Sequence, residues 1–146
     1  MGADYTLLVE KGAPASEMGG AIGNAFEGEG ADTSIECSGT ESGVNCALFA
    51  TGPSGVVVLV GIGPAEVKIP VIKTCMRREI DVRGIFRYAN CYPRAISMVA
   101  TRKVDLKPLV SHRFPLEEVQ EAFETSKRPK SGVMKIIIKC RGSAIQ

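Results

Sequence analysis

One unbroken apolar run, Val56 to Val60, constrains the fold of this chain more than any other segment. A run of this kind between glycines is typical of a strand covered on both faces, as in the parallel sheets of α/β proteins. The run ends in Gly61 and Gly63, where no β-carbon shields the backbone. The segment therefore predicts a buried parallel strand with a bare turn at its carboxyl end.

Strand and helix patterns alternate along the first part of the chain. Apolar runs predict strands at residues 5–9, 32–37 and 55–60. Apolar residues at helical spacing predict one helix that Ser16 caps and a second around residues 44–48. Strands that alternate with helices are typically parallel and joined by crossovers. We therefore expect an α/β fold that forms part of a doubly wound, Rossmann-type parallel sheet.

A further strand is expected at Ile80 to Phe86. It delivers Phe86, Arg87 and Tyr88 at its carboxyl end, where open α/β sheets bind ligands. Arginine carries five donors in a fixed geometry and tyrosine a hydroxyl on a rigid ring, so both suit the alignment of an alcohol. We expect the functional groups at this strand end and at the end of the preceding strand.

The pattern changes after Lys107. Before it, the sequence predicts a brief helix at residues 71–78 and another that Pro93 opens. After it, we expect a strand at 109–113, a helix at 115–126 and a strand at 134–139. This change divides the chain into a first part, residues 1–106, that belongs to the doubly wound sheet, and a separate C-terminal segment, residues 107–146.

Composition excludes several classes of partner. The net charge is +2 and basic residues are scattered, so no basic stripe is available for nucleic acid. The apolar runs are shorter than the roughly 18 to 20 residues of a membrane span. Asp4 and Glu10 lie where a signal peptide would be apolar. We therefore expect a cytoplasmic protein that binds neither nucleic acid nor membranes.

The five cysteines and the single histidine do not form a recognisable site. There is no Cys-x-x-Cys pair, and a catalytic zinc needs three protein ligands close together. We expect His112 to have a structural role and Cys37 to be an inert buried thiol, because no basic group is evident beside it. The residues alone indicate no catalytic group and no metal site.

The Gly61-Ile-Gly63 turn departs from the dinucleotide fingerprint G-x-G-x-x-G, because Glu66 stands at the position of the third glycine. Two interpretations of this turn remain open. It is either a plain tight turn or a strand end whose backbone groups approach a flat ligand, such as the carboxamide of a nicotinamide ring.

Several segments together resemble the sorbitol (L-iditol) dehydrogenases, a group within the zinc-containing medium-chain dehydrogenase family. Their order and spacing carry the resemblance, which runs over nearly the whole chain. The segments are IECSG at 35–39, VLVGIG at 58–63, GIFRY at 84–88, AISM at 95–98, KPLVSHRFPLEE at 107–118 and AFETSK at 122–127.

The resemblance implies an NAD-dependent oxidation of sorbitol or related polyols to ketoses by hydride transfer. It implies that Arg87 and Tyr88 reach the hydroxyl groups of the polyol, and that residues 36–39 line the adenosine side of the cofactor site. The residues that it places against the nicotinamide end of NAD are Val60, Gly61, Ile62, Ile85, Phe86 and Arg87.

The same resemblance implies that this chain is the C-terminal part of a larger enzyme, and that residues 1–106 are the C-terminal part of its NAD-binding, Rossmann-type domain. The zinc-binding catalytic domain and the glycine-rich nucleotide loop of the family have no counterpart in the sequence, so zinc would have no ligands here. We therefore expect the chain to be inactive alone and residues 107–146 to pack on the absent catalytic domain. Subunits of the family pair through the strand that matches Ile80 to Phe86, which implies a homo-oligomer.

Two alternatives remain. The chain can be a noncatalytic, truncated module for dinucleotide binding or dimerisation. It can also be related to zinc-independent quinone reductases, which need only NADPH, although the GIFRY segment at residues 84–88 favours the polyol dehydrogenases.

Overall fold

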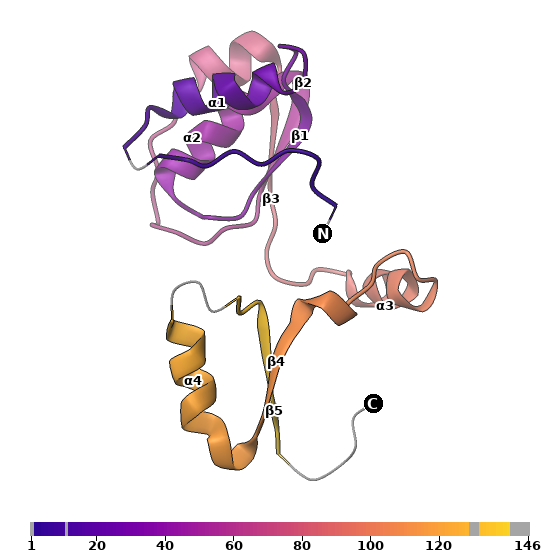
Figure 1. Ribbon diagram of the computed structural model, residues 1–146. Helices are drawn as coiled ribbons and strands as arrows, with labels where there is room; N and C mark the ends of the chain where they lie inside the picture. Colours follow the sequence, from indigo (N-terminus) through magenta and orange to yellow (C-terminus); the bar gives the residue numbers. More distant parts are fainter. Residues whose placement is uncertain (1, 11, 129–131, 141–146) are drawn as a thin grey trace. The chain divides into compact units, whose positions relative to one another are not determined.

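The computed structural model describes residues 2–10, 12–128 and 132–140. The chain forms two compact units, Met1–Ala89 and Asn90–Gln146 (Figure 1). The sequence places the end of the first domain at residue 106 instead. The assignment of residues 90–106 to that domain stays a prediction.

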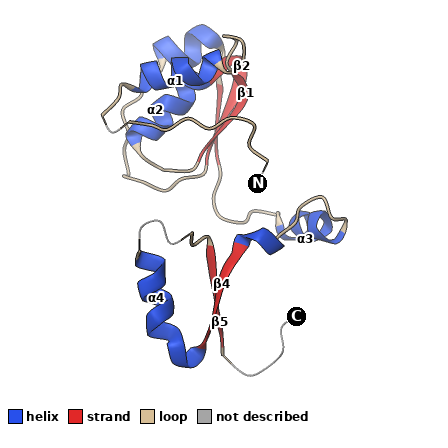
Figure 2. Ribbon diagram, viewed as in Figure 1, coloured by secondary structure: helices blue, strands red, loops and turns tan. Residues whose placement is uncertain are grey.

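The first unit contains a parallel sheet of three strands in the order β1-β2-β3 (Figure 2). The sheet residues Ile35, Val58 and Arg83 are register partners across the three strands. This arrangement confirms the α/β class and the parallel pairing. The elements are α1 (Ala15–Asn24), β1 (Ala31–Glu36), α2 (Glu41–Ala50), β2 (Thr51–Leu59), the π-helix η1 (Ile72–Met76) and β3 (Asp81–Gly84).

The core of the first unit lies between α2 and the sheet. Val44 and Leu48 of α2 pack with Val57 of β2, whose side chain is 0% exposed. Burying a side chain of this size contributes about 1.5–3 kcal/mol. The prediction that this strand is covered on both faces is wrong for the described residues. Successive side chains point to opposite faces, and Val58 is only half-buried while its register partner Ile35 is 64% exposed.

Two local predictions at the start of the chain are wrong. Residues 5–9 do not form a strand, because they join neither sheet of the described chain, and Leu8 is exposed. Ser16 does not cap the first helix, because α1 begins at Ala15 after Pro14 in an extended conformation.

The strands near the expected site differ in length from the prediction. β2 begins at Thr51, before the predicted start at residue 55, and β3 covers only Asp81–Gly84 within the predicted 80–86. Ile80 lies buried in the core just before β3. The predicted helix at 71–78 contains the π-helix η1.

The second unit contains a parallel pair of strands, β4 and β5, joined through α4. Ser111 Oγ of β4 accepts hydrogen bonds from Met134 N at 2.9 Å and Lys135 N at 3.2 Å, which holds the start of β5. The predicted order of strand, helix and strand is confirmed, but the α-helix begins at Val119 and not at Pro115, which belongs to β4. The elements are α3 (Tyr92–Ala100), the 3-10 helix η2 (Lys107–Leu109), β4 (Val110–Pro115), the 3-10 helix η3 (Leu116–Glu118), α4 (Val119–Lys127) and β5 (Lys135–Lys139).

No helix in the described part of the chain is long and apolar enough to cross a membrane.

Candidate functional site

The carboxyl ends of the three strands in the first unit meet at one edge of the sheet. The carbonyl oxygen of Glu36, the last residue of β1, accepts hydrogen bonds from Val60 N at 2.8 Å and Gly61 N at 2.9 Å. Ile85 N, just after β3, donates to the carbonyl of Leu59 at 3.3 Å. The structure therefore brings both expected segments, residues 60–62 and residue 85, to the same sheet edge.

The turns after β1 and β2 touch backbone to backbone. A β-carbon added to Gly61 or Gly63 would collide with the backbone of Gly39, and one added to Gly39 would collide with the backbone of Ile62. Gly39 also has φ +70°, which favours glycine. These contacts by themselves explain why glycine stands at 39, 61 and 63. The turn at residues 61–63 is therefore tightly packed against the turn after β1, whether or not a ligand also approaches it.

Glu36 organises the turn after β1 through its carboxylate. The side chain is buried, with Glu36 only 5% exposed. Its Oε1 accepts hydrogen bonds from Ser38 N at 2.7 Å and Ser38 Oγ at 2.5 Å. Gly39 N lies 3.0 Å from Oε1 and 2.9 Å from Oε2. Each oxygen of the carboxylate therefore has at least one donor.

These contacts decide the ionisation of the buried carboxyl. Burial raises the pKa of Glu36, but hydrogen bonds from the Ser38 hydroxyl and from the amides of Gly39 and Ser38 lower it. The net pKa lies below the usual value of 4.5. Glu36 is therefore a carboxylate at neutral pH.

The same network reaches the first turn of α2. Thr40 is the N-cap, and its Oγ1 accepts a hydrogen bond from Gly43 N at 3.0 Å. Ser38 Oγ lies 2.9 Å from Thr40 Oγ1. A β-carbon on Gly43 would collide with the Ser38 hydroxyl and with the Glu36 carboxylate. A carboxylate at this position is favoured by the positive end of the helix dipole.

The sequence predicts only a lining role for residues 36–39 and no function of its own for Glu36. A carboxylate at a strand end, followed at once by Ser38 and Gly39, was the available signal, because such a side chain can bond the amides of its own turn. The prediction that Cys37 is buried is wrong, because this residue is exposed.

The predicted substrate residues Arg87 and Tyr88 lie in an exposed turn after β3. Arg87 has φ +51°, and its guanidinium lies 5.0 Å from the centre of the Phe86 ring. Ile62 and Phe86 are 85% and 70% exposed. The two strand ends thus present exposed apolar side chains, and the Arg87 guanidinium lies over one of them, Phe86. The roles of these residues stay predictions.

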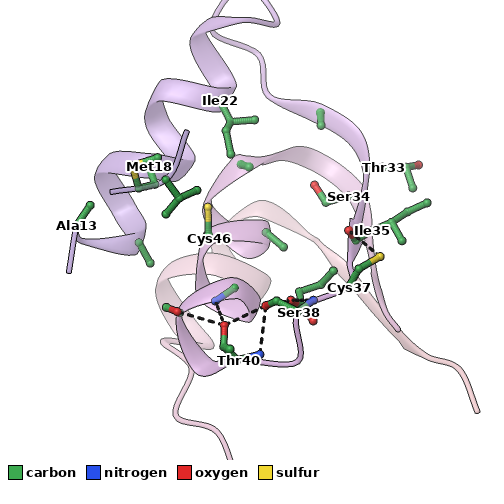
Figure 3. Close-up of a pocket in the computed structure, with 18 of the residues that line it drawn as sticks. Ala13, Met18, Ile22, Thr33, Ser34, Ile35, Cys37, Ser38, Thr40 and Cys46 are labelled. Carbon is green, nitrogen blue, oxygen red and sulfur yellow. Dashed lines mark hydrogen bonds between the residues drawn. The ribbon is translucent and has the colours of Figure 1, made fainter. Parts of the chain in front are cut away.

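A cavity of about 570 Å³ lies between α1, α2 and β1 and reaches the turn after β1 (Figure 3). Met18 and Ile22 line it from α1, Ile35 from β1 and Cys46 from α2. Burial raises the pKa of the Cys46 thiol, which makes it a poor nucleophile at neutral pH. Glu36, Cys37 and Ser38, which are predicted to line the adenosine side of the cofactor site, also line this cavity. None of the predicted site residues at 60–62 or 85–88 lines it.

Within residues 2–10, 12–128 and 132–140, no group of three or more His, Cys, Asp or Glu side chains could hold a metal ion. His112 of β4 is half-buried and stacks with Phe114, with ring centres 6.4 Å apart. Its Nδ1 is buried and has no hydrogen-bond partner in the described part of the chain. The described residues therefore do not fit the ligand set of a catalytic zinc.

Known proteins share both the sequence and the fold. The family of zinc-binding dehydrogenases matches residues 1–101. Sorbitol dehydrogenase of Mus musculus is 44% identical over 144 residues, which cover 96% of this chain and 38% of the mouse protein. This chain thus spans 38% of the length of that relative.

Two solved structures extend the comparison. L-Idonate 5-dehydrogenase of Escherichia coli has a TM-score of 0.65 and 31% identity, over 80% of this chain and 34% of that one. A zinc-binding dehydrogenase of Sinorhizobium meliloti bound to NADP has a TM-score of 0.65 and 27% identity, over 76% and 32%. The resemblance drawn from the motifs is confirmed, and this chain belongs to the family of zinc-binding dehydrogenases.

Proposed function

We propose that this chain is part of an NAD-dependent polyol dehydrogenase. Its residues 60–62 and 85–87 form the surface, here called the nicotinamide wall, against which the nicotinamide ring of the cofactor rests. One observation carries the proposal: the hydrogen bond from Ile85 N to the Leu59 carbonyl holds two exposed strand ends side by side. The similarity to sorbitol dehydrogenases supports the choice of a polyol as substrate.

The residues present fit the flat end of a nicotinamide cofactor. Val60, Ile62 and Phe86 are exposed apolar side chains at the sheet edge where α/β folds bind ligands. Glycine at positions 61 and 63 leaves the main chain there without β-carbons, so backbone groups can approach a carboxamide. When bound, NAD supplies a hydride acceptor for a secondary alcohol.

In this proposal Arg87 and Tyr88 orient the polyol. The Arg87 guanidinium, which stacks over Phe86, offers donors in a fixed plane, and the Tyr88 ring carries a hydroxyl on a rigid arm. Orientation of this kind lowers the barrier by holding the reacting C–H near the acceptor. No step is assigned to zinc, because the described residues do not fit its ligand set.

Titration of the isotope-labelled 146-residue chain with NADH tests the proposal by NMR. We expect shifts concentrated in the backbone amides of residues 60–62 and 85–87. NADPH in a parallel titration tests the choice of NAD, since a relative of this chain was solved with NADP. Replacement Arg87→Ala should weaken the response to an added polyol, whereas Arg94→Ala, at an exposed position in α3, is the matched control.

The fragment is proposed to be catalytically inactive alone. Oxidation of sorbitol or xylitol by NAD with the purified chain, dependent on added zinc, would contradict this. The expected result is no turnover above the rate without protein.

A second candidate function is self-association through β3. This strand pairs with β2 on one side only within the described chain, and its four residues are exposed. An open edge of this kind is a template for pairing with another strand. Sedimentation should show a dimer that Val82→Lys disrupts. A monomer at all accessible concentrations would exclude this role.

Cytoplasmic location also stays a proposal. The five cysteines are all free thiols, which suits a reducing compartment. Fractionation of cells that express the tagged chain would test it.

A further inference from the structure

We infer that Glu36 is a positioning residue that holds the proposed nicotinamide wall in shape. The inference rests on the proposed function, because it assigns Glu36 a task at that same site. Glu36 belongs to β1, whereas the wall belongs to the ends of β2 and β3. The structure nevertheless connects Glu36 to the wall by two routes.

The first route is the main chain. The carbonyl oxygen of Glu36 accepts hydrogen bonds from both Val60 N and Gly61 N, at 2.8 and 2.9 Å. These two amides belong to residues that the proposal places against the ring. Any shift of Glu36 along β1 therefore moves the first two residues of the wall.

The second route is the side chain. The carboxylate bonds the amides of Ser38 and Gly39, which folds the turn back on itself. The folded turn presents the backbone of Gly39 to Gly61 and Gly63 at a distance that leaves no room for a β-carbon. The turn at residues 37–39 thus supports the turn at residues 61–63 by direct backbone contact, and we call it the buttress. The Glu36 carboxylate sets the shape of this buttress.

A carboxylate is the group that this position requires. Oε1 has two donors on Ser38 and shares the Gly39 amide with Oε2, so every contact is an acceptor contact. A carboxylate has only acceptors, and a glutamine at the same place would turn an NH₂ group toward one of these donors. Glu36→Gln therefore preserves size while it breaks the pattern of the turn.

A simpler role is stabilisation of α2 alone, because the carboxylate lies at the first turn of that helix beside Thr40. The two roles predict changes in different places. Loss of helix stabilisation acts on the first turn of α2, whereas loss of the buttress acts on Val60 and Gly61.

The experiment compares Glu36→Gln with Glu41→Gln in the complete 146-residue chain. Glu41 is a matched control: its Oε2 accepts a hydrogen bond from the amide of Lys68 at 2.8 Å, so it also ties a distant loop to α2. Glu41 is exposed, and its carboxylate bonds the Lys68 amide, outside the turn at residues 36–39 and the turn at residues 60–63. Hydrogen exchange of the Val60 and Gly61 amides is followed by NMR without ligand, and NADH is then titrated.

We expect amide exchange at Val60 and Gly61 to be faster by about tenfold or more in Glu36→Gln. The variant keeps the main-chain carbonyl that accepts from these amides, but it loses hydrogen bonds between the charged carboxylate and the turn at Ser38 and Gly39. The loss of one such bond is large enough to give this factor. NADH binding should weaken by a similar factor. Glu41→Gln should leave both unchanged. Equal effects of the two variants, or unchanged exchange at Val60 and Gly61, would overturn the inference.

The two proposals fail in different ways. If the wild-type chain gives no NADH shifts at residues 60–62, the proposed function fails, while exchange at Val60 and Gly61 still decides whether Glu36 braces this turn. If NADH binds the wild type and Glu36→Gln equally well, the positioning role fails and the proposed function stands.

Discussion

Gly39 and Gly61, at the ends of neighbouring strands, lie so close that a β-carbon on Gly61 would collide with the amide of Gly39. The contact joins the turns after β1 and β2. No sequence pattern indicates that these two glycines lie together. The contact makes the shape of the proposed ring-binding wall depend on a residue in the turn after β1.

Replacement Gly61→Ala tests this contact. We expect a loss of about 1–3 kcal/mol in the free energy of unfolding, because an added methyl group must displace backbone that cannot rotate away. Urea unfolding measures it. Gly20→Ala is the control, because nothing lies within 4 Å of a β-carbon there and α1 should gain about 0.5–1 kcal/mol from the better helix former. A Gly61→Ala protein as stable as wild type would contradict the packing described.

Acidification should remove the stabilisation that Glu36 provides. Its pKa in the folded chain is lowered, so its contribution is complete above the unfolded value near 4.5 and is lost as the pH falls through the folded pKa. The wild type should therefore exceed Glu36→Gln in stability at neutral pH, and the difference should shrink below pH 4.5. Urea unfolding of both proteins across this range measures the difference. A gap that stays constant or widens in acid would be inconsistent with an ionised Glu36.

Arg78 should stabilise the junction between α2 and β2. Its guanidinium donates to the carbonyls of Leu48 at 3.3 Å and Phe49 at 3.4 Å, and also to that of Thr51. Arg78→Met should cost about 1.5–3 kcal/mol, because hydrogen bonds from a charged group are lost and these carbonyls are partly buried. Thermal unfolding measures the loss. Arg77→Met, at an exposed position beside it, should have little effect, and equal effects would refute the role of Arg78.

The β4–β5 pair should be the less stable sheet. Its two strands and α4 leave Ile136, Ile137 and Ile138 only half-buried, and a two-stranded sheet is marginal without further packing. Amide exchange at these residues should be much faster than at Val57 in the isolated chain. Protection equal to that of Val57 would show that the segment needs no partner domain.

The sequence predicts the elements whose signals are local. β1, α2 and β2 follow from apolar runs and helical spacing, and these elements carry the core residues Val44, Leu48 and Val57. Residues 5–9 have the same apolar pattern as a strand but form none, because a strand also needs a neighbour and the pattern says nothing about one.

The candidate site shows the same limit. The strand ends at residues 60–63 and 85–88 could be located, because parallel strands place their carboxyl ends together. The structural role of Glu36 could not, because it depends on contacts between turns that are far apart in sequence. Glycine at 61 has a packing reason that only the position of Gly39 reveals.

Saturation-transfer NMR on NADH in the presence of the 146-residue chain tests the central claim most directly, because it reports which end of the cofactor touches the protein. We predict that the nicotinamide ring protons receive more saturation than the adenine protons, and that amides 60–62 shift in the same sample. Saturation confined to adenine, or absent from the whole cofactor, would contradict the nicotinamide wall.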